Sequence, residues 1–390
     1  MGSTSGNTAG TDVVVIGAGV IGLATAWRLT DRGLSVVLVD PAPGTGASWT
    51  AAGMLAPVTE LHYGEAPLLA LNLESARRYV AFAAELTERT GIDVGYRPCG
   101  TVTAAWDGAD LTDVRALADF AASLGEPGEM LTGRELHALV PGIAPGLPGG
   151  FYASGDHQVD NRRLVEALLA VTSGVVTYHR RVVELLGADG RAGGVLLEDG
   201  TRLDASYVVL AAGAWSGAIA GLAPDLLPPV RPVKGQTLRL RAGRGSVPDL
   251  TVRAAVRGTP VYVVPRAGGE VVVGASSEEA GFDVRPRAGA MYELLRDAQS
   301  VLPGLSEAEF VDVSTGLRPG TPDNAPLLGP TRMPGLIAAT GHYRNGILLT
   351  PITADVIASV IVDGVMPSVA APFTPDRFGA GRVPVPAATS

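Results

Sequence analysis

The first hydrophobic segments of the chain follow the order strand, helix, strand. Residues 13–16 (VVVI) form a short β-branched run, which is typical of a buried parallel strand. Apolar residues at helical spacing then continue to Leu29, and Gly33 ends this helix. A second apolar run over residues 35–39 finishes at Asp40. This order predicts one complete βαβ unit at the start of the chain.

Helical spacing of apolar residues returns in five later segments, and each predicts a helix. These segments are residues 67–90, 111–122, 160–171, 287–301 and 344–365. The first of them places Leu69, Leu73 and Leu86 on one face and is followed by Gly91, a common helix terminator. The last contains Pro351 near its start, where we expect the helix to be interrupted.

The strand patterns are of two kinds. Short buried runs over residues 206–212 and 336–340 resemble the first strand and suit a parallel sheet. Residues 96–106 predict a pair of strands, and residues 175–203 predict a meander of short strands. Between residues 229 and 316, longer alternating segments predict a mainly antiparallel sheet with one covered face. Those segments are residues 236–240, 251–256, 261–265 and 270–275.

The two kinds of strand predict an α/β protein with a Rossmann-like dinucleotide-binding domain and an α+β second domain built on the antiparallel sheet. A stretch rich in proline and glycine, residues 141–150, marks a crossing between the domains. The first domain is expected to be discontinuous, with residues 11–85, 150–228 and 317–375. The second is expected to hold residues 86–149 and 229–316. Flexible tails are expected at residues 1–10 and 376–390.

The turn between the first strand and helix reads GAGVIG, residues 17–22, and matches the pattern GxGxxG. Its glycines permit a tight turn, close approach to a pyrophosphate and close packing of the helix on the strand. The start of the helix offers N–H groups and a positive dipole end to the phosphates. Asp40 ends the second strand, where an acid can bind ribose hydroxyls. An acid rather than an arginine at this position argues against NADP.

Composition narrows the class of protein. The chain has 390 residues, 46% of them hydrophobic and 18% charged, which is enough for a large buried core. The net charge of −9 argues against a nucleic-acid partner, because phosphate binding needs a positive surface. The arginine pairs at 77–78, 162–163 and 180–181 are interpreted as solvated faces. The five histidines show no metal-ligand spacing, so no metal is expected.

Cellular location is also constrained by the sequence. The longest apolar run, residues 13–24, is shorter than the roughly 20 residues that a membrane helix needs, so no membrane partner is expected. No basic residue precedes Arg28, as a signal peptide would require. Cys99 is the only cysteine, which fits a reducing compartment. We therefore expect a cytoplasmic protein.

The segment after the second strand, residues 46–54 (GASWTAAGM), is rich in small and hydroxyl-bearing residues. Such a loop lets the backbone approach a flat, bulky ring, and Ser48 and Thr50 can bond phosphate or ribityl oxygens. An ordinary linker can have the same composition. As a binding loop, the segment favours FAD over NAD as the dinucleotide. A second glycine fingerprint is absent from the sequence, which argues against a flavin reductase that also binds NAD(P)H.

Together these motifs resemble the start of the D-amino-acid oxidase superfamily of flavoenzymes. The turn at 17–22, Asp40 and the loop at 48–54 are most similar to bacterial glycine oxidases of the thiazole (thiamine) pathway. The resemblance extends from about residue 12 to about residue 365. It implies the glutathione-reductase-type architecture of that superfamily, with FAD as cofactor. Covalently flavinylated sarcosine oxidases use a cysteine in the C-terminal third, where this chain has none, so non-covalent FAD is expected.

Two later segments are expected near the cofactor. The superfamily has an AAGAW element there, found here at residues 211–215, and by analogy Val183 contacts the adenine. Residues 341–348 (GHYRNGIL) join a strand end to a helix start, so their N–H groups can face the flavin pyrimidine edge, although a simple connection would look alike. The expected cofactor contacts are Gly17, Gly19, Val20, Ile21, Gly22, Asp40, Pro41, Ser48, Thr50, Ala51, Ala52, Gly53, Met54, Val183, Ala212, Gly213, Trp215, Arg318, His342, Tyr343, Arg344, Asn345, Gly346, Ile347 and Leu348.

Tyr262, Arg318 and Arg344 are the candidates for substrate binding and catalysis. A guanidinium fork matches a carboxylate in two parallel hydrogen bonds, and a phenol can add a further donor. Tyr262 and Arg318 match the superfamily's ligands of the substrate carboxylate, although a single arginine can equally form a surface ion pair. His342 is expected to be structural. Lys234, the only lysine, is expected to stabilise a turn.

The resemblance implies oxidative deamination of a small amino acid, with glycine, sarcosine and a small D-amino acid all open. Hydride transfer to flavin N5 would give an imine, which hydrolyses to a 2-oxo acid and ammonia or an amine, and oxygen would reoxidise the flavin with release of hydrogen peroxide. Pro260 stands where related glycine oxidases can carry a polar residue, and Ser276 and Ser277 make the expected pocket edge polar. Both features leave the substrate open.

Two other functions remain open on the sequence. A dehydrogenase of the same fold would pass electrons to an acceptor other than oxygen and would need an apolar or basic docking surface. A non-catalytic FAD-binding protein would lack the pair Tyr262 and Arg318, which this chain has. Assembly into a homo-oligomer also stays open.

Overall fold

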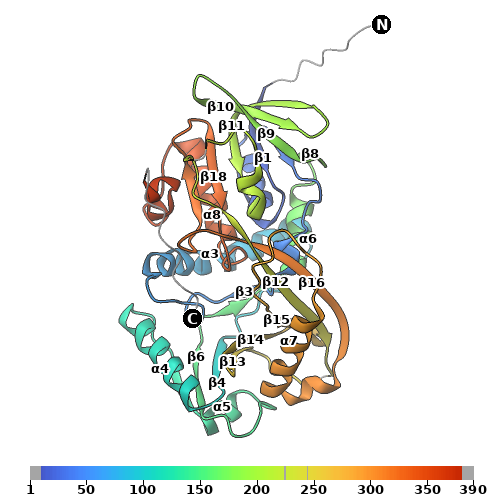
Figure 1. The fold of residues 1–390 in the computed structure, drawn as a ribbon, viewed down its shortest axis with the longest axis vertical. Helices are drawn as coiled ribbons and strands as arrows, with labels where there is room; N and C mark the ends of the chain where they lie inside the picture. Colours follow the sequence, from blue (N-terminus) through green and yellow to red (C-terminus); the bar gives the residue numbers. More distant parts are fainter. Residues whose placement is uncertain (1–9, 224, 244, 380–390) are drawn as a thin grey trace.

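The βαβ unit at the start of the chain forms the centre of the first sheet. Strand β1 (Thr11–Ile16) pairs in parallel with β2 (Val36–Val39), and α1 (Val20–Asp31) connects them. The order of strands in this sheet is β17 (Leu327–Pro330), β18 (Leu336–Thr340), β11 (Arg202–Leu210), β1, β2 and β8 (Val176–Tyr178). The computed structural model describes residues 10–379 except 224 and 244 (Figure 1). Within them, the predicted βαβ unit and α/β fold are confirmed.

The first sheet is covered on both faces, as its β-branched strands predict. One face packs against four helices, α1, α3 (Ala66–Thr90), α6 (Asn161–Val171) and α8 (Thr350–Ala358). The other face packs against the hairpin of β9 (Val182–Ala188) and β10 (Arg191–Leu197), which lies at the top of Figure 1. Val13, Val14 and Val15 of β1 are completely buried between these layers.

The second sheet fills the lower half of Figure 1. Its order is β16 (Glu309–Gly320), β12 (Arg231–Arg241), β15 (Glu270–Gly274), β14 (Thr259–Pro265), β13 (Thr251–Val256), β4 (Thr101–Ala105), β6 (Gly149–Ala153) and β5 (Glu129–Thr132). All neighbours are antiparallel except β13 and β4. This confirms the mainly antiparallel second sheet.

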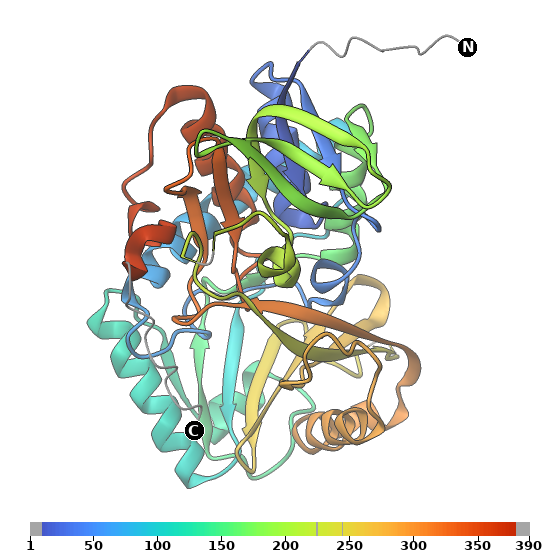
Figure 2. The same ribbon diagram turned by 45° about the horizontal axis from the view of Figure 1, so that its top comes forward.

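Three helices lie against the second sheet. Leu136 of α5 (Gly133–Leu139) and Leu294 of α7 (Ala288–Val301) belong to its main hydrophobic core. Val114 of α4 (Gly108–Ser123) packs near Phe151 of β6. The long strands β12 and β16 run side by side across the middle of the molecule, beneath the first sheet (Figure 2). They bring residues of the second sheet close to the glycine turn.

Three local predictions were wrong. Residues 96–106 hold one strand, β4, rather than a strand pair. Lys234 lies inside β12 rather than in a turn. The helix expected over 344–365 begins at Thr350, with Pro351 in its first turn and a π-helical end at Ser359–Asp363. Proline is tolerated in a first turn because the N–H that it lacks has no helical partner there, so Pro351 helps to start the helix instead of interrupting it.

The boundaries expected between domains need correction at two strands. Residues 150–153 belong to β6 and residues 317–320 to β16, so both segments lie in the second sheet rather than with the first domain. Each strand crosses its expected boundary because a strand ends where its pairing with its neighbours ends, and not where the local composition changes. The rest of the domain division stays a prediction.

The expected tails fall largely outside the described residues, which exclude 1–9 and 380–390. Residues 376–379, however, are held in place: Arg377 donates to both carboxylate oxygens of Asp323, at 2.8 and 2.9 Å, and Phe378 is buried. The expected flexible C-terminal segment therefore begins too early at residue 376. Among the helices of the described chain, none is long and apolar enough to cross a bilayer.

Candidate active site

A cavity of about 720 Å³ lies between the glycine turn and the second sheet. This volume is within the range of sites that hold a cofactor or small ligand. Tyr262 and all the expected cofactor contacts line it, except Gly22, Asn345 and Leu348. The expected residues therefore come together from segments that are far apart in the chain. Their roles in binding and catalysis remain proposals.

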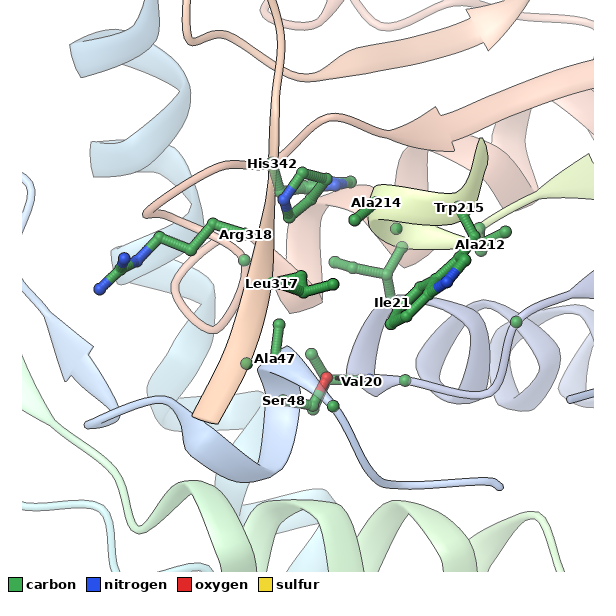
Figure 3. A pocket seen from close by; sticks show the side chains of 18 of the residues that line it. Val20, Ile21, Ala47, Ser48, Ala212, Ala214, Trp215, Leu317, Arg318 and His342 are labelled. Atoms are coloured by element: carbon green, nitrogen blue, oxygen red, sulfur yellow. Dashed lines mark hydrogen bonds between the residues drawn. The ribbon is translucent and has the colours of Figure 1, made fainter. Parts of the chain in front are cut away.

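The glycine turn is shaped for close approach at one end of the cavity. Gly17 has a φ of 101°, and a Cβ there would lie 2.7 Å from the carbonyl carbon of Ala211 at the end of β11. Gly22 does not line the cavity, because it packs against the Gly17 carbonyl, where a Cβ would clash. The Val20 N–H at the start of α1 donates to Ser48 Oγ at 3.1 Å (Figure 3). The turn thus keeps the helix start next to the loop after β2.

Asp40 stabilises the turn from the end of β2. Its two carboxylate oxygens accept from the N–H groups of Ala18 and Ala42, both at 2.7 Å. A carboxylate has about four lone-pair sites, so each oxygen can still accept from a hydroxyl. Asp40 also lines the cavity, which fits a role with ribose hydroxyls.

Several lining residues were missed from the sequence. Arg180 and Arg181, interpreted as solvated, line the cavity beside Val183. Gly235 and Thr237 of β12 and Gly316 of β16 line it from the second sheet. A Cβ on Gly316 would lie 3.0 Å from Ala47 Cα in α2 (Ala47–Thr50), so this glycine lets β16 pass close to that helix. A glycine within a strand was the available signal, since it often marks close backbone approach.

Arg318 lies on Gly235 across the pair β16 and β12. A Cβ on Gly235 would lie 2.6 Å from Arg318 Cζ, so the guanidinium occupies the space that a side chain would fill. Arg318 Nη1 donates to the Ser276 carbonyl at 3.0 Å. Among the described residues, Arg318 has no carboxylate within 4.0 Å, so its charge is not neutralised by an ion pair. In Figure 3 it points away from Val20 and Trp215.

Tyr262 lies on a second glycine in the same way. It is directly opposite Gly274 on β15, and a Cβ there would lie 2.6 Å from Tyr262 Cε2. Burial, opposed by the charge of nearby Arg318, raises the pKa of Tyr262. The phenol is therefore protonated at neutral pH and can donate a hydrogen bond. Tyr262 and Arg318 together offer donors to an anion at this end of the cavity.

Glu60 is a cavity-lining carboxylate whose charge acts on the Tyr262 phenol. It lines the cavity, is largely buried, and pairs with Arg253, the residue opposite Tyr262 on β13. Burial alone would raise the pKa of Glu60, but the charges of Arg253 and Arg344 hold it below its usual value. Glu60 is therefore ionised, and it offsets Arg253 rather than Arg318.

Arg344 has a weaker partner. Its Nη2 lies 3.7 Å from Glu65 Oε1, and its guanidinium lies 5.1 Å from the centre of the Tyr343 ring. Burial raises the pKa of Glu65 despite the nearby charge of Arg344. Within residues 10–379, Arg344 Nε is buried with no hydrogen-bond partner. Arg318 and Arg344 therefore leave this end of the cavity positive, which suits a carboxylate ligand.

His342 lines the cavity and is within hydrogen-bond distance of a neighbouring helix. It is buried, and its Nε2 lies 3.0 Å from Thr353 Oγ1 in α8. Burial lowers the pKa of His342 to about 3, so the ring is neutral at physiological pH. The neutral ring of His342, at the edge of the cavity, connects the turn after β18 to the first part of α8.

The cavity suits an extended dinucleotide. One end has the glycine turn, the start of α1 and Asp40, which match a pyrophosphate and a ribose. The small residues Ala51, Ala52 and Gly53 line the middle of the cavity. A Cβ on Gly53 would lie 2.9 Å from Arg266 Nη2. These features define a class of protein that holds a dinucleotide between a Rossmann-like sheet and a second sheet bearing the donors Tyr262 and Arg318.

Comparison with known proteins identifies the family. Residues 12–360 match the family model of FAD-dependent oxidoreductases named DAO. The chain belongs to this family, and its cofactor is FAD. A glycine oxidase of Geobacillus kaustophilus is 37% identical over 356 residues, which cover 90% of this chain and 92% of that protein.

Other relatives agree in fold and extent. The solved glycine oxidase of Geobacillus kaustophilus has a TM-score of 0.87 and 34% identity, and covers 94% of this chain and 98% of that one. An iminodiacetate oxidase of Chelativorans has a TM-score of 0.80 and 28% identity over 93% of this chain and 98% of that one. The bifunctional protein ThiO/ThiG of Nostoc is 38% identical over 90% of this chain, which spans about half (53%) of that protein.

Proposed function

We propose that this chain catalyses the FAD-dependent oxidative deamination of a small amino acid, with glycine or an N-substituted glycine as the preferred substrate. The observation that carries the proposal is the pair Arg318 and Tyr262, each lying on a strand glycine in the cavity that also contains the glycine turn. Glycine oxidases at 34–37% identity support the substrate class. The iminodiacetate oxidase supports a secondary amine with a carboxymethyl group.

The side chains of this site bind and orient the substrate. Arg318 donates hydrogen bonds to the carboxylate through its guanidinium fork, and the Tyr262 hydroxyl donates to the same group. Arg344 adds positive charge at the same end of the cavity. Holding the carboxylate at two points presents the amine carbon in one orientation, so positioning accounts for most of the rate. The chemistry that bound FAD supplies is acceptance of a hydride from the amine carbon and transfer of the electron pair to dioxygen, giving hydrogen peroxide.

This mechanism assigns no general base to the protein. Glu60 is paired with Arg253, His342 is neutral and hydrogen-bonded to Thr353, and Tyr262 keeps its proton. Loss of hydride from a neutral amine gives an iminium ion, which water hydrolyses to a 2-oxo acid and an ammonium or alkylammonium ion. A substrate amine that binds in its neutral form satisfies this proton balance.

The purified protein tests the proposal directly. We expect a yellow protein with a flavin spectrum that releases peroxide with glycine or sarcosine faster than with larger D-amino acids. Replacing Arg318 by Met should raise KM about 100-fold or more while FAD stays bound, because a bidentate charged contact is lost. Arg241→Met, which removes an exposed arginine from neighbouring β12, is the control. Rapid dye reduction without peroxide would favour a dehydrogenase, and an unchanged KM in the Arg318 variant would contradict the assigned site.

A further inference from the structure

A buried polar network lies on β12 at the two residues that flank Gly235. Lys234 and Gln236 are both completely buried. Lys234 Nζ donates to the Arg285 carbonyl at 2.7 Å and lies 3.3 Å from Glu278 Oε2. Gln236 Nε2 donates to Glu278 Oε1 at 2.6 Å. The two polar residues on either side of Gly235 therefore hold one carboxylate of the segment after β15.

The same carboxylate is linked to Arg318 through Ser276. Ser276 Oγ donates to Glu278 Oε1 at 2.7 Å and accepts from the Gln236 N–H at 3.0 Å. The Ser276 carbonyl then accepts from Arg318 Nη1 at 3.0 Å. Lys234 and Glu278 also exchange backbone hydrogen bonds, at 3.0 and 2.9 Å. A continuous series of contacts thus runs from Lys234 through Glu278 and Ser276 to the guanidinium.

A buried charged network is an energetically unfavourable way to fill a protein core. Removing an ammonium group from water costs several kcal/mol unless a partner and good hydrogen bonds compensate, and apolar residues of similar volume often give equal stability. Although burial acts in the opposite direction, the hydrogen bonds from Gln236, Ser276 and Lys234 hold the pKa of Glu278 below its usual value. Glu278 is therefore ionised at neutral pH, and the Ser276 carbonyl that it helps to hold is the acceptor for Arg318.

We propose that Lys234 and Glu278 are positioning residues for substrate binding: they hold the Ser276 carbonyl, which orients the Arg318 guanidinium over Gly235. This inference rests on the proposed function, in which Arg318 binds the substrate carboxylate. The network acts on Arg318 through the Ser276 carbonyl, so neither Lys234 nor Glu278 needs to contact substrate. Without it, the segment from Ser276 to Arg285 loses its central anchor and Arg318 loses the acceptor that selects one of its rotamers.

Loss of this network is expected to weaken substrate binding rather than to change the redox chemistry. Arg318 has no carboxylate partner among the described residues; the Ser276 carbonyl is its backbone acceptor and, with the nearby Tyr262 phenol, limits its motion. A guanidinium free to rotate must be ordered again when substrate binds, and this lowers affinity. We therefore expect carboxylate affinity and KM to change, with a smaller change in turnover at saturating substrate.

A matched pair of neighbouring carboxylates tests the proposal in the FAD-loaded enzyme. Glu278→Gln keeps the shape of the side chain but removes the charge that pairs with Lys234. Glu279→Gln makes the same change one residue away, at an exposed residue that pairs with Arg231. Acetate is the probe, because it offers a carboxylate without an oxidisable amine, and its Kd is read from the flavin spectrum. We expect Glu278→Gln to weaken acetate and raise KM by about tenfold, with kcat within about threefold, and Glu279→Gln to stay within about twofold.

A double-variant cycle separates positioning from general stabilisation. If Glu278 acts through Arg318, the variant Glu278→Gln/Arg318→Met binds acetate no more weakly than Arg318→Met alone. Additive losses would overturn the proposal, and so would unchanged acetate affinity in Glu278→Gln. Lys234→Met should repeat the Glu278→Gln result; if it does not fold, the Glu278 cycle decides.

Failure of this inference can be distinguished from failure of the proposed function. If Arg318→Met binds acetate as well as the unmodified enzyme does, Arg318 is not the carboxylate ligand and the proposed function loses its site. If Arg318→Met loses acetate while Glu278→Gln does not, the proposed function stands and the positioning role of Lys234 and Glu278 is overturned.

Discussion

Gly235 and Gly274 owe their importance to the side chains that lie on them. Arg318 covers the first and Tyr262 the second, and both glycines are strand residues without positive φ. Their conformation does not therefore require glycine; the space above them does. Two residues without a functional side chain thus determine where the side chains of Arg318 and Tyr262 lie.

Replacing Gly235 by alanine should weaken substrate binding with little loss of stability. The new Cβ would displace the Arg318 guanidinium, which is the flexible end of a long side chain and can move without disturbing the core. We expect KM to rise about tenfold or more, because misplacement of a binding group by about 1 Å is costly. FAD content and Tm should stay near those of the unmodified enzyme. Gly193→Ala, at an open strand position of β10, is the control; equal effects of the two changes would contradict the prediction.

His342 should make stability depend on pH. Its folded pKa of about 3 lies below the ordinary value of 6.5, so the unfolded chain binds more protons between these values. Its contribution is complete above pH 6.5 and is lost as pH falls toward 3. From pH 7.5 to 5.5, the stability difference between the unmodified protein and His342→Gln should shrink by about 1.4 kcal/mol in urea unfolding.

Asp156, whose pKa burial raises to about 6, acts in the opposite direction, but it is present in both proteins and cancels in the difference. A difference that stays constant between pH 7.5 and 5.5 would show that His342 titrates alike in the folded and unfolded states.

At the scale of elements, the first residue of α6 joins the two halves of the site. Asn161 Nδ2 donates to the carbonyls of Ser48 and Trp49 in α2, both at 2.9 Å. Its Oδ1 accepts from Arg239 Nη2 of β12 at 3.0 Å. One buried amide thereby connects the loop after β2 to the strand that holds Gly235. Asp160, the preceding residue, caps α6 through the N–H groups of Arg162 and Arg163.

Asn161→Ala should destabilise the protein and loosen the cofactor site together. One buried and two partly buried polar groups would lose their partner, so we expect a loss of about 2–4 kcal/mol in the free energy of unfolding of the apoprotein. FAD affinity should fall as well, because the loop that carries Ser48 would no longer be tied to β12. Glu166→Ala, on the exposed face of the same helix, should change neither. Lost stability with unchanged FAD affinity would show that Asn161 supports the fold alone.

For the whole molecule, the cavity lies between the two sheets and is lined by both. Its lining comes from β1, β2 and β9 on one side and from β12, β14 and β16 on the other. A ligand in this cavity is held by both sheets, and it stabilises the folded state by mass action. Binding of the cofactor and stability of the entire protein should therefore be coupled.

Thermal unfolding of the apoprotein with added nucleotide tests this coupling. FAD at 100 times its Kd should stabilise the protein by about 2.7 kcal/mol and raise Tm. NAD⁺ at the same concentration should leave Tm unchanged, because it lacks the isoalloxazine ring that the loop at 46–54 and the second sheet accommodate. An equal rise with both nucleotides would mean that only the adenylate end is recognised.

Much of the fold could be predicted because its signals are local. The β-branched run of β1, the glycines of residues 17–22 and the alternation in β12 to β15 each report on their own neighbourhood. The errors occur where pairing partners decide. Lys234 was placed in a turn because Gly235 follows it, and only the pairing of β12 with β16 shows that this glycine lies in a strand. Likewise, pairing extends β6 and β16 across the expected boundaries.

By itself, the sequence determined the dinucleotide fold, the class of cofactor and the side chains able to bind a carboxylate, because these depend on residue type and short spacing. Only the tertiary structure decided which of them meet. It showed that Arg318 and Tyr262 lie over strand glycines, that Glu60 neutralises Arg253, and that Lys234 is connected to Arg318 through Glu278 and Ser276. Several of these contacts join residues far apart in the chain, such as Ser276 and Arg318, which are 42 positions apart, and no local pattern records such a contact.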